Sequence, residues 1–222
     1  MTWLLLAALL GAPADEAMIA TLVEGTVTAG GKSLFVGSVL HPGDTIETQA
    51  GGRIEIAVVG GSLVRLGEGS RLTISPDMGG KAFSARLWLG NLWARVQLLL
   101  AGQPFEVETE NGIAGVRGTE FRVEVSPDRP DLLRVYQGQV QVAGREGRWT
   151  FQVEGGRELL FRREAEAPRS FDPASERGHG FMEWVRSRKT PDGEQPGRVR
   201  SEQPNPEQEH RMLQRKQRPK EH

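Results

Sequence analysis

The sequence predicts an all-β protein built from many short strands. Short runs in which apolar and polar residues alternate recur about every ten residues between positions 18 and 161, and glycine, proline or aspartate separates them. Nothing in this span repeats apolar residues with the period of a helix. So many short strands cannot form one flat sheet, and they must pack as two layers or close on themselves. A β-roll or short solenoid is the alternative architecture.

Each alternating run is bounded by a turn sequence and is therefore an expected strand. Three glycines, Gly25, Gly90 and Gly138, each stand just before the alternation resumes. A glycine at such a place indicates a bend at which a strand passes from one sheet to the other. The expected strands are 20–28, 33–36, 45–47, 53–59, 63–66, 71–75, 83–89, 92–98, 105–110, 120–125, 132–137, 139–142, 149–154 and 157–161.

The stretch 105–125 has the clearest pattern of all. Asn111-Gly112 follows the first of its strands and predicts a type I′ hairpin turn, in which both central positions need a positive φ. Residues 113–116 then return as the partner strand. Gly115 and Gly118 lie close together before the alternation resumes, and this spacing predicts a bulge or bend.

Several motifs of the chain resemble those of the FecR family. They include GDTIET at 43–48, GSLVRL at 61–66, GVRGTEF at 115–121 and VYQGQVQV at 135–142, and together they extend over about half of the chain. The family consists of extracytoplasmic β domains named after a regulator that relays iron-citrate uptake to a sigma factor. This resemblance implies a jelly-roll-like β-sandwich of two layers, and a role in signalling or as an envelope scaffold. Gly60 stands where the family often has aspartate, which we interpret as a turn variant.

Residues 1–14 have the features of a signal peptide. An apolar run at 3–10 is too short to span a bilayer, and Ala12-Pro13-Ala14 supplies small residues for cleavage after Ala14. A buried first strand or helix is the alternative. The rest of the sequence has no apolar run of the ~20 residues that a membrane helix needs, so we expect a stand-alone periplasmic or secreted protein with no transmembrane segment after cleavage.

The composition excludes several classes of function. The sequence has no cysteine, which rules out disulfides, thiolate nucleophiles and cysteine-based metal sites. The formal net charge of −1 does not favour nucleic acid or an anionic membrane as a partner of the whole protein. We expect no cofactor.

The chain is expected to divide into a FecR-like β domain at 15–162, a linker with a short docking helix at 163–189 and a disordered charged tail at 190–222. Asp172 can cap a helix that begins at Pro173. Phe181, Trp184 and Val185 then share one helical face. We favour the interpretation that this face docks on the sandwich; a partner-binding helix is the alternative.

Candidate catalytic and metal residues are few, and we predict no catalytic, metal or cofactor site. His41 lies in a His-Pro-Gly-Asp turn, which is a poor setting for a catalytic triad. Glu106, Glu108 and Glu110 share one strand face, as paired glycosidase carboxylates would, but such spacing is typical of an exposed strand face. A further pair, Asp128 and Asp131, could contribute to a calcium site, although two carboxylates are too few.

The GVRGTEF motif supplies the site residues that we single out, Gly115, Arg117, Gly118 and Thr119. We expect Arg117 to be partly buried in an ion pair that fixes the bend, in preference to binding a ligand. Gly118 is then required for the backbone geometry, and Thr119 caps the turn. Three tryptophans are candidates for an aromatic binding surface, with core packing favoured for at least two: Trp88, Trp93 and Trp149.

These observations together predict a secreted, non-enzymatic FecR-like module of the bacterial cell envelope. We expect it to act in signalling by binding a protein or a cell-wall glycan. A carbohydrate-active enzyme on a β-sandwich is the competing class, and it requires two carboxylates that face each other across a cleft.

Overall fold

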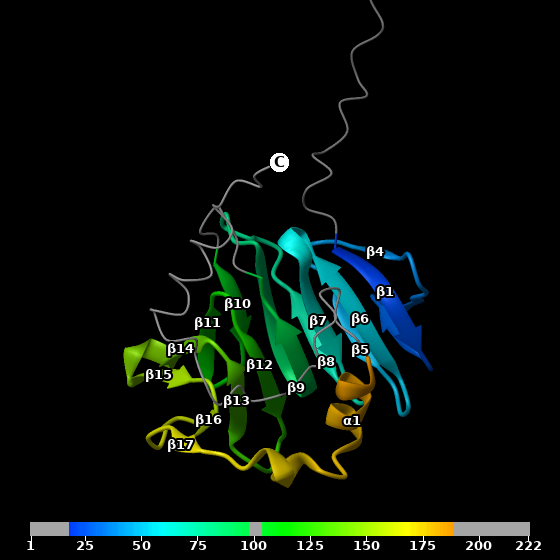
Figure 1. The fold of residues 1–222 in the computed structure, drawn as a ribbon. Helices are drawn as coiled ribbons and strands as arrows, with labels where there is room; N and C mark the ends of the chain where they lie inside the picture. The colour runs from blue at the N-terminus through cyan, green and yellow to red at the C-terminus, as the bar shows by residue number, and fades with distance from the viewer. Residues whose placement is uncertain (1–17, 98–103, 189–222) are drawn as a thin grey trace, which may run out of the picture.

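Two hydrogen-bonded β-sheets, packed face to face, make up this protein, whose computed structural model describes residues 18–97 and 104–188 (Figure 1). The all-β fold class is confirmed. The predicted signal peptide at 1–14 and the predicted tail at 190–222 lie outside the described residues.

Sheet A is antiparallel throughout, with the strand order β4-β1-β6-β7-β9-β12-β13-β16-β17. Strand β17 pairs with β16, so the sheet continues past position 162, the expected end of the domain. The strands are β1 (Met18–Glu24), β4 (Val39–Leu40), β6 (Arg53–Val58), β7 (Ser62–Leu66), β9 (Phe83–Arg95), β12 (Glu120–Val125), β13 (Asp131–Gln137), β16 (Arg157–Phe161) and β17 (Arg169–Ser170).

Sheet B has the order β3-β2-β5-β8-β9-β10-β11-β14-β15, and only its β9–β10 pair is parallel. In both sheets the strand number rises almost steadily from one edge to the other, because the chain crosses back and forth between the layers as it advances. The further strands are β2 (Val27–Ala29), β3 (Lys32–Ser33), β5 (Thr45–Thr48), β8 (Arg71–Ile74), β10 (Phe105–Glu108), β11 (Gly112–Val116), β14 (Gln139–Gly144) and β15 (Thr150–Glu154).

Strand β9 belongs to both sheets. Its first half pairs with β8 and β10 in sheet B, and its second half pairs with β7 and β12 in sheet A. The sequence predicted two strands here, and the structure has one, bent at Gly90, whose φ is +94°. Gly25 and Gly138 also have positive φ values where the chain changes sheets, at the β1–β2 and β13–β14 corners. The interpretation of these three glycines as sheet-changing bends is thus correct.

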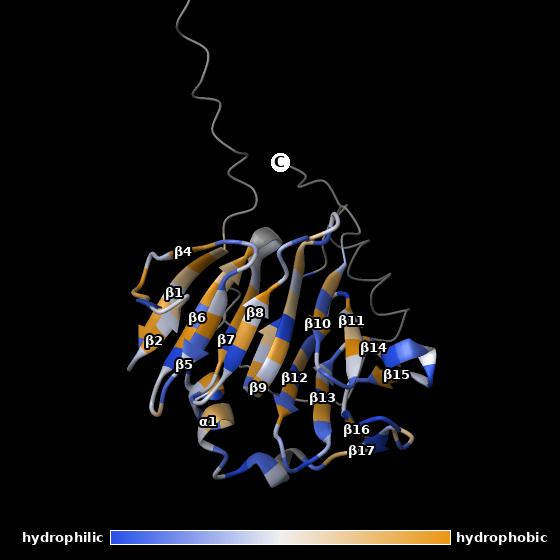
Figure 2. Ribbon diagram, turned by 180° about the vertical axis from the view of Figure 1, so that it is seen from behind, coloured by the Kyte–Doolittle hydropathy of each residue, from blue (hydrophilic) through white to orange (hydrophobic). Residues whose placement is uncertain are grey.

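The core fills the space between the inner faces of the two sheets. Hydrophobic and hydrophilic residues alternate along many of the strands (Figure 2), and the buried hydrophobic ones form this core. Phe105 of sheet B stacks on Phe83 at 4.7 Å between ring centroids and meets Phe121 of sheet A edge-on at 6.3 Å. Each such side chain, once buried, contributes about 1.5–3 kcal/mol to the free energy of unfolding.

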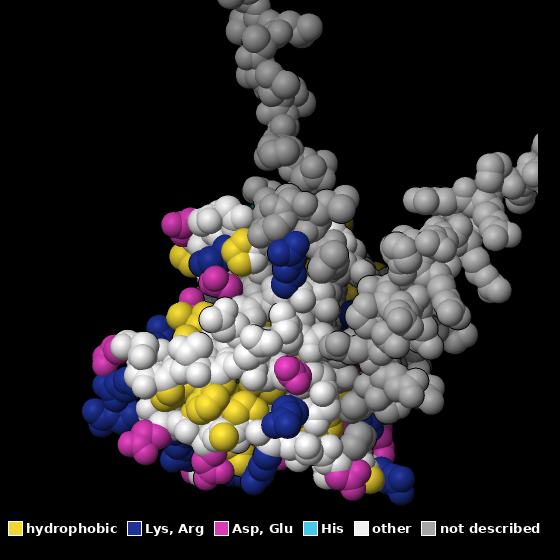
Figure 3. All heavy atoms as spheres, turned by 60° about the vertical axis from the view of Figure 1, so that its left-hand side comes forward, with side chains coloured by type: hydrophobic (Ala, Val, Ile, Leu, Met, Phe, Trp, Pro, Cys, Tyr) yellow, Lys and Arg dark blue, Asp and Glu magenta, His cyan; other side chains and the backbone are white. Residues whose placement is uncertain are grey.

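Where β14 to β17 lie, the end of the sandwich is less completely closed. A band of hydrophobic side chains is visible there among interspersed basic and acidic ones (Figure 3). Trp149, Phe151 and Ala165 are partly buried and pack against the core. The Trp149 indole also donates to the carbonyl oxygen of Arg163 at 3.2 Å, so the chain after β16 helps to cover this end.

Two local predictions are wrong. The β10–β11 hairpin forms, but neither Asn111 nor Gly112 has a positive φ, so the turn is not of type I′. The Thr109 hydroxyl oxygen instead accepts hydrogen bonds from both of their amides at 3.1 Å. Secondly, Asp172 does cap a helix that begins at Pro173, but this helix is the short 3-10 helix η4 (Pro173–Glu176). The α-helix α1 (Gly180–Ser187), which carries Phe181, Trp184 and Val185, begins separately after a further turn.

Two more 3-10 turns, η2 (Val59–Gly61) and η3 (Arg145–Gly147), connect strands. The helices of the described ranges are all too short or too polar to cross a bilayer.

Candidate functional site

The outer face of sheet A carries a row of polar and aromatic side chains that runs across the strands from β6 to β16. Neighbouring members lie directly opposite one another in the strand pairing. Their neighbours along each strand point into the core, so strand alternation places all of them outside it. This cross-sheet row consists of Glu55, Arg65, Trp93, Arg122, Arg134 and Glu158.

The segment that follows β17 covers the cross-sheet row with η4 and α1 (Figure 1). A second apolar core forms between this segment and the sheet, and Phe181, Trp184 and Val185 enter it from one face of α1. Its buried members are Leu63, Trp93, Tyr136, Phe171, Phe181, Met182, Trp184 and Val185. The docking interpretation of the helix therefore agrees with the structure. In this arrangement its apolar face is occupied and is not a free partner-binding surface.

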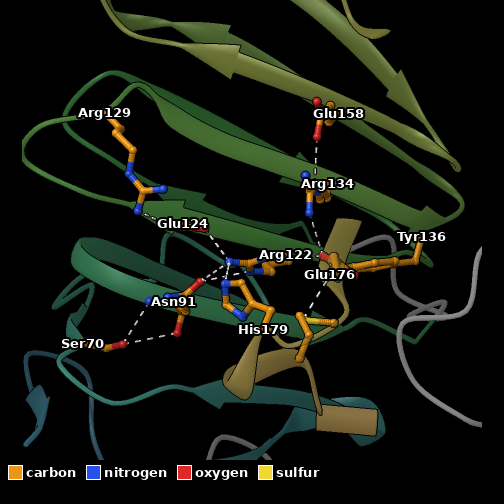
Figure 4. Close-up of polar contacts among 11 residues, drawn as sticks. Ser70, Asn91, Arg122, Glu124, Arg129, Arg134, Tyr136, Glu158, Glu176 and His179 are labelled. Carbon is orange, nitrogen blue, oxygen red and sulfur yellow. Dashed lines mark hydrogen bonds and ion pairs between the residues drawn. The ribbon is translucent and has the colours of Figure 1, made fainter. Parts of the chain in front are cut away.

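Glu176, at the end of η4, is the centre of the polar contacts (Figure 4). Its side chain is 0% exposed. One carboxylate oxygen accepts hydrogen bonds from the Tyr136 hydroxyl at 2.7 Å, from Arg134 Nη1 at 3.1 Å and from Arg122 Nη1 at 3.3 Å. The other accepts from Arg186 Nη2 at 2.5 Å. A buried carboxylate with this many charge-assisted donors is well compensated for its loss of hydration.

Arg122 uses its other nitrogens on neighbouring groups (Figure 4). Its Nε and Nη2 donate to Asn91 Oδ1 at 3.0 and 2.6 Å, and Nη2 also contacts Glu124. His179 Nε2 lies 2.7 Å from Nη2 and can only accept there, because a guanidinium has no acceptor. The residue is 1% exposed, so these partners replace nearly all of its water. We call Glu176, Arg122, Arg134, Tyr136 and His179 the Glu176 cluster.

Arg65 ties the other end of α1 to the sheet. Its Nε donates to Glu55 Oε2 at 2.7 Å, and its Nη1 donates to the carbonyl oxygen of Val185, in the last turn of the helix, at 2.9 Å. The guanidinium carbon lies 4.8 Å from the centroid of the Trp93 ring, a cation–π distance. This contact orients the arginine toward the Val185 carbonyl, which also accepts a hydrogen bond from the Arg188 amide at the end of the helix at 3.3 Å.

Burial also perturbs the protonation of the Glu176 cluster. Burial and the neighbouring charge of Glu176 raise the pKa of Tyr136 well above its ordinary value, so the phenol stays protonated and keeps donating. Burial and the positive charge of Arg122 lower the pKa of His179 below its usual range. The surroundings of the cluster thus favour a protonated Tyr136 and a neutral His179. In this state the cluster holds the chain's own C-terminal segment on sheet A.

The outer face of sheet B has a different character, because no described element covers its centre. A hollow of about 380 Å³ lies over β10, β11, β14 and β15. Gly115 lies among its lining residues, and we call it the Gly115 hollow. The polar and glycine residues that line it are Glu106, Gly115, Arg117, Gln139, Gln141 and Gln152.

Arg117 does not occupy the place that the sequence predicted. Its side chain is exposed on the Gly115 hollow and is not buried in an ion pair. The reason is strand phase: Ala114 and Val116 point into the core, so Gly115 and Arg117 point out. Gly118, with φ +60°, makes the corner between β11 and β12, and the Thr119 hydroxyl lies 3.0 Å from the Arg117 carbonyl oxygen and 2.8 Å from that of Gln139. These two residues fix the bend as expected.

The glutamates of β10 engage cations across the sheet face. Glu106 pairs with Lys81 at 2.9 Å and Glu108 with Arg145 at 3.2 Å. Glu106 is the one carboxylate in the described lining of the Gly115 hollow, whereas acid–base hydrolysis of a glycoside uses two. The geometry therefore supports binding at this place and gives no support to hydrolysis.

The remaining polar candidates lie apart from one another. His41 is exposed, and its amide donates to Asp44 within the expected turn at 2.8 Å. Asp131 is buried, which raises its pKa, and accepts a hydrogen bond from Asn111 at 3.0 Å, while Asp128 is exposed. Among residues 18–97 and 104–188 no group of three or more acidic or histidine side chains is placed to bind a metal ion.

The three candidate tryptophans differ in their burial, as their positions in the strands require. Trp93 is fully buried under α1, and Trp149 packs at the end of the sandwich. Trp88 is 48% exposed on the outer face of sheet B, where Arg86 stacks on its ring at 4.1 Å. Trp88 is therefore the most exposed of these three candidates.

The fold and these two faces define an all-β sandwich that closes one outer face with its own C-terminal segment and leaves the Gly115 hollow on the other. Residues 44–141 match the family described as FecR protein, the family that the motifs of the sequence resemble. FecR domains are extracytoplasmic modules associated with signalling. The match includes Gly115 and Arg117 but neither Glu176 nor α1.

Solved structures agree on the fold. Two crystal structures of a protein described as a "putative anti-sigma factor" from Parabacteroides distasonis superpose with a TM-score of 0.52 at 18% sequence identity. The similarity covers 62% of this chain and 64% or 63% of theirs, so the chain spans less than two thirds of those proteins. No curated protein matches the chain significantly.

The residues that reasoning from the sequence missed are the buried charges of sheet A. Alternation shows that Arg65 and Arg122 point away from the core, but it does not show whether another element covers them. A usable signal was present in the apolar face of Phe181, Trp184 and Val185, which requires a partly apolar surface to dock on. Nothing in the sequence around Glu176 indicates burial.

Proposed function

We propose that this chain is a secreted, signalling-associated binding module of the bacterial cell envelope, and that it meets its partner with the outer face of sheet B. The observation that carries this proposal is the asymmetry of the two outer faces. The face of sheet A is occupied by η4 and α1. The face of sheet B carries the Gly115 hollow and the exposed ring of Trp88.

The match to the FecR family supports the location and the type of role. FecR domains are extracytoplasmic in general, and the match of residues 44–141 to this family supports the same location for this chain. The predicted signal peptide at 1–14 provides the route of export. The outer face of sheet A binds the chain's own C-terminal segment, whereas the motif residue Arg117 lines the hollow on the outer face of sheet B.

Fractionation of cells that make the full-length protein tests the location. We expect the protein in the envelope fraction with a mature sequence that begins at Asp15, whereas an intact protein confined to the cytoplasm would overturn the proposal. The working face is tested with a photo-crosslinking residue placed at Trp88 and, as the matched control, at Glu183 on the exposed side of α1. An envelope component captured from Trp88 but not from Glu183 supports the proposal, and the reverse contradicts it.

A further inference from the structure

Gly115 has no structural reason to be glycine. It lies inside strand β11, its φ is not positive, and the nearest atom that an added Cβ would meet is the Gln141 carbonyl oxygen at 3.8 Å, an ordinary contact. The sheet-changing glycines differ, since a Cβ at Gly138 would lie 2.6 Å from the Gly118 carbonyl oxygen. Glycine within a strand costs stability, because it adds backbone entropy to the unfolded chain and packs nothing.

The position of Gly115 shows what its missing side chain does. A row of directly paired residues crosses the outer face of sheet B, and Gly115 stands in it between Glu106 of β10 and Gln141 of β14, with Gln152 of β15 next. All three neighbours carry long polar side chains. The gap at Gly115 is therefore the floor of the hollow, and a larger residue there would fill it.

The lining has the chemistry of a site for a hydroxyl-rich ligand. Each of the glutamines Gln139, Gln141 and Gln152 offers both donors and an acceptor, Arg117 offers only donors, and Glu106 only acceptors. Hydroxyl groups both donate and accept, so they can satisfy such a mixed set, whereas an apolar ligand would leave it unpaired. The volume of about 380 Å³ lies within the range of small-molecule sites.

Two contacts already orient the lining before a ligand arrives. Gln152 Nε2 donates to Gln139 Oε1 at 2.8 Å, which leaves the other donor of that amide for a ligand. Lys81 pairs with Glu106 at 2.9 Å and so fixes the carboxylate. No described carboxylate forms an ion pair with Arg117, and its guanidinium remains available to a ligand oxygen.

We propose that the Gly115 hollow binds a saccharide, with Gln141, Gln152 and Arg117 donating to and accepting from its hydroxyl groups and Gly115 leaving room for the sugar ring. This proposal rests on the proposed function, of which it names the ligand class: an envelope glycan. Glu106, as the single described carboxylate of the lining, takes part in binding and leaves the glycosidic bond intact.

Calorimetric titration of the full-length protein tests the site. Two probes are used separately, solubilised glycan strands of peptidoglycan and a neutral glucose oligosaccharide, to distinguish a cell-wall source from other polysaccharides. Gly115→Val fills the hollow with a residue that strands favour, so we expect its melting temperature to be equal or higher while its affinity falls at least about tenfold. Gln141→Ala changes only an exposed side chain and should weaken binding without altering the fold.

Thr150→Val is the control, because Thr150 is exposed on β15 but does not line the hollow. It should bind as the wild type does. If the wild type binds neither probe, or if folded Gly115→Val and Gln141→Ala bind as well as the wild type, the saccharide site is wrong. A photo-crosslinker at Gln141 that captures a protein and no glycan would also overturn it.

The two proposals fail in different ways. Recovery of the protein from the cytoplasm alone would overturn the envelope function, whatever the purified protein binds. Recovery from the envelope, combined with saccharide binding that does not depend on Gly115, would overturn the site and leave the envelope function intact.

Discussion

Replacing Glu176 with glutamine removes one buried negative charge and almost no volume. The carboxylate at present receives hydrogen bonds from Tyr136 and from three arginines, Arg122, Arg134 and Arg186. Glutamine can accept at one atom only, and its amide group would point a donor at guanidinium groups that are donors themselves. The substitution thus removes the carboxylate that Arg186 pairs with and leaves Arg122 and Arg134 with one counter-ion fewer, Glu124 and Glu158 remaining.

The expected loss in the free energy of unfolding follows from the burial of these side chains. Glu176 is 0% exposed and Arg122 is 1% exposed, so water cannot replace the lost charge. Breaking a buried ion pair on one side costs about 3–5 kcal/mol. For a domain of this size, that loss corresponds to a melting temperature lower by about 6–20 °C.

The structure also limits how much of the protein the substitution can unfold. Glu176 lies in the segment that covers sheet A and outside the main core, so its removal can release η4 and α1 while the sandwich stays folded. Hydrogen exchange should therefore be faster in residues 171–188 than in wild type, and unchanged in β6 and β12.

The assay compares melting curves and hydrogen exchange of wild type, Glu176→Gln and the control Glu154→Gln. Glu154 is an exposed glutamate of β15, and its substitution should change the free energy of unfolding by no more than about 0.5 kcal/mol. A Glu176→Gln protein that melts within about 1 °C of wild type, with the same exchange in 171–188, would refute the reasoning.

Three further predictions concern single residues. The pKa of His179 is lower in the folded protein than its ordinary value of 6.5, so as the pH falls the unfolded chain takes up the proton first. The free energy of unfolding therefore keeps its full value above pH 6.5 and decreases as the pH falls below it. Thermal melts between about pH 7.5 and about 5 should show this loss of stability. The variant His179→Gln removes the titrating group beside Arg122, Glu124 and Glu176, and should therefore lose less stability over this range. An identical pH profile in the variant would contradict the assignment to His179. Gly90→Ala should lower stability by more than about 2 kcal/mol in denaturant titrations, because φ is +94° and the new Cβ would lie 2.6 Å from Ser70 Cα; a neutral effect would show that β9 does not need this bend. Arg117→Ala should leave the free energy of unfolding within about 0.5 kcal/mol of wild type, since the side chain is exposed, and a loss of several kcal/mol would restore the buried-ion interpretation.

Local patterns were sufficient wherever a single strand and its turn decide the structure. Alternation of apolar and polar residues identified most strands, because a sheet with one buried face imposes a period of two. The glycines at positions 25, 90 and 138 marked changes of sheet, because positive φ values are costly for other residues. The apolar face of α1 was recognised from the spacing of Phe181, Trp184 and Val185.

The same local rules failed where a second element decides the outcome. Asn111-Gly112 favours a type I′ turn, yet the Thr109 side chain accepts from both amides and selects another turn. Arg117 was expected inside because glycines flank it, although strand phase directs it to solvent.

The sequence by itself determined the all-β class, the match of 44–141 to the FecR family and the residues that point toward the core, because these depend on period and on short motifs. Only the tertiary structure decided which outward-facing residues meet solvent. Arg65 and the Val185 carbonyl that it binds are 120 positions apart, and Arg122 and Glu176 are 54 apart. No local pattern encodes such distant pairs, because whether an outer face of a sandwich is covered depends on where the rest of the chain packs.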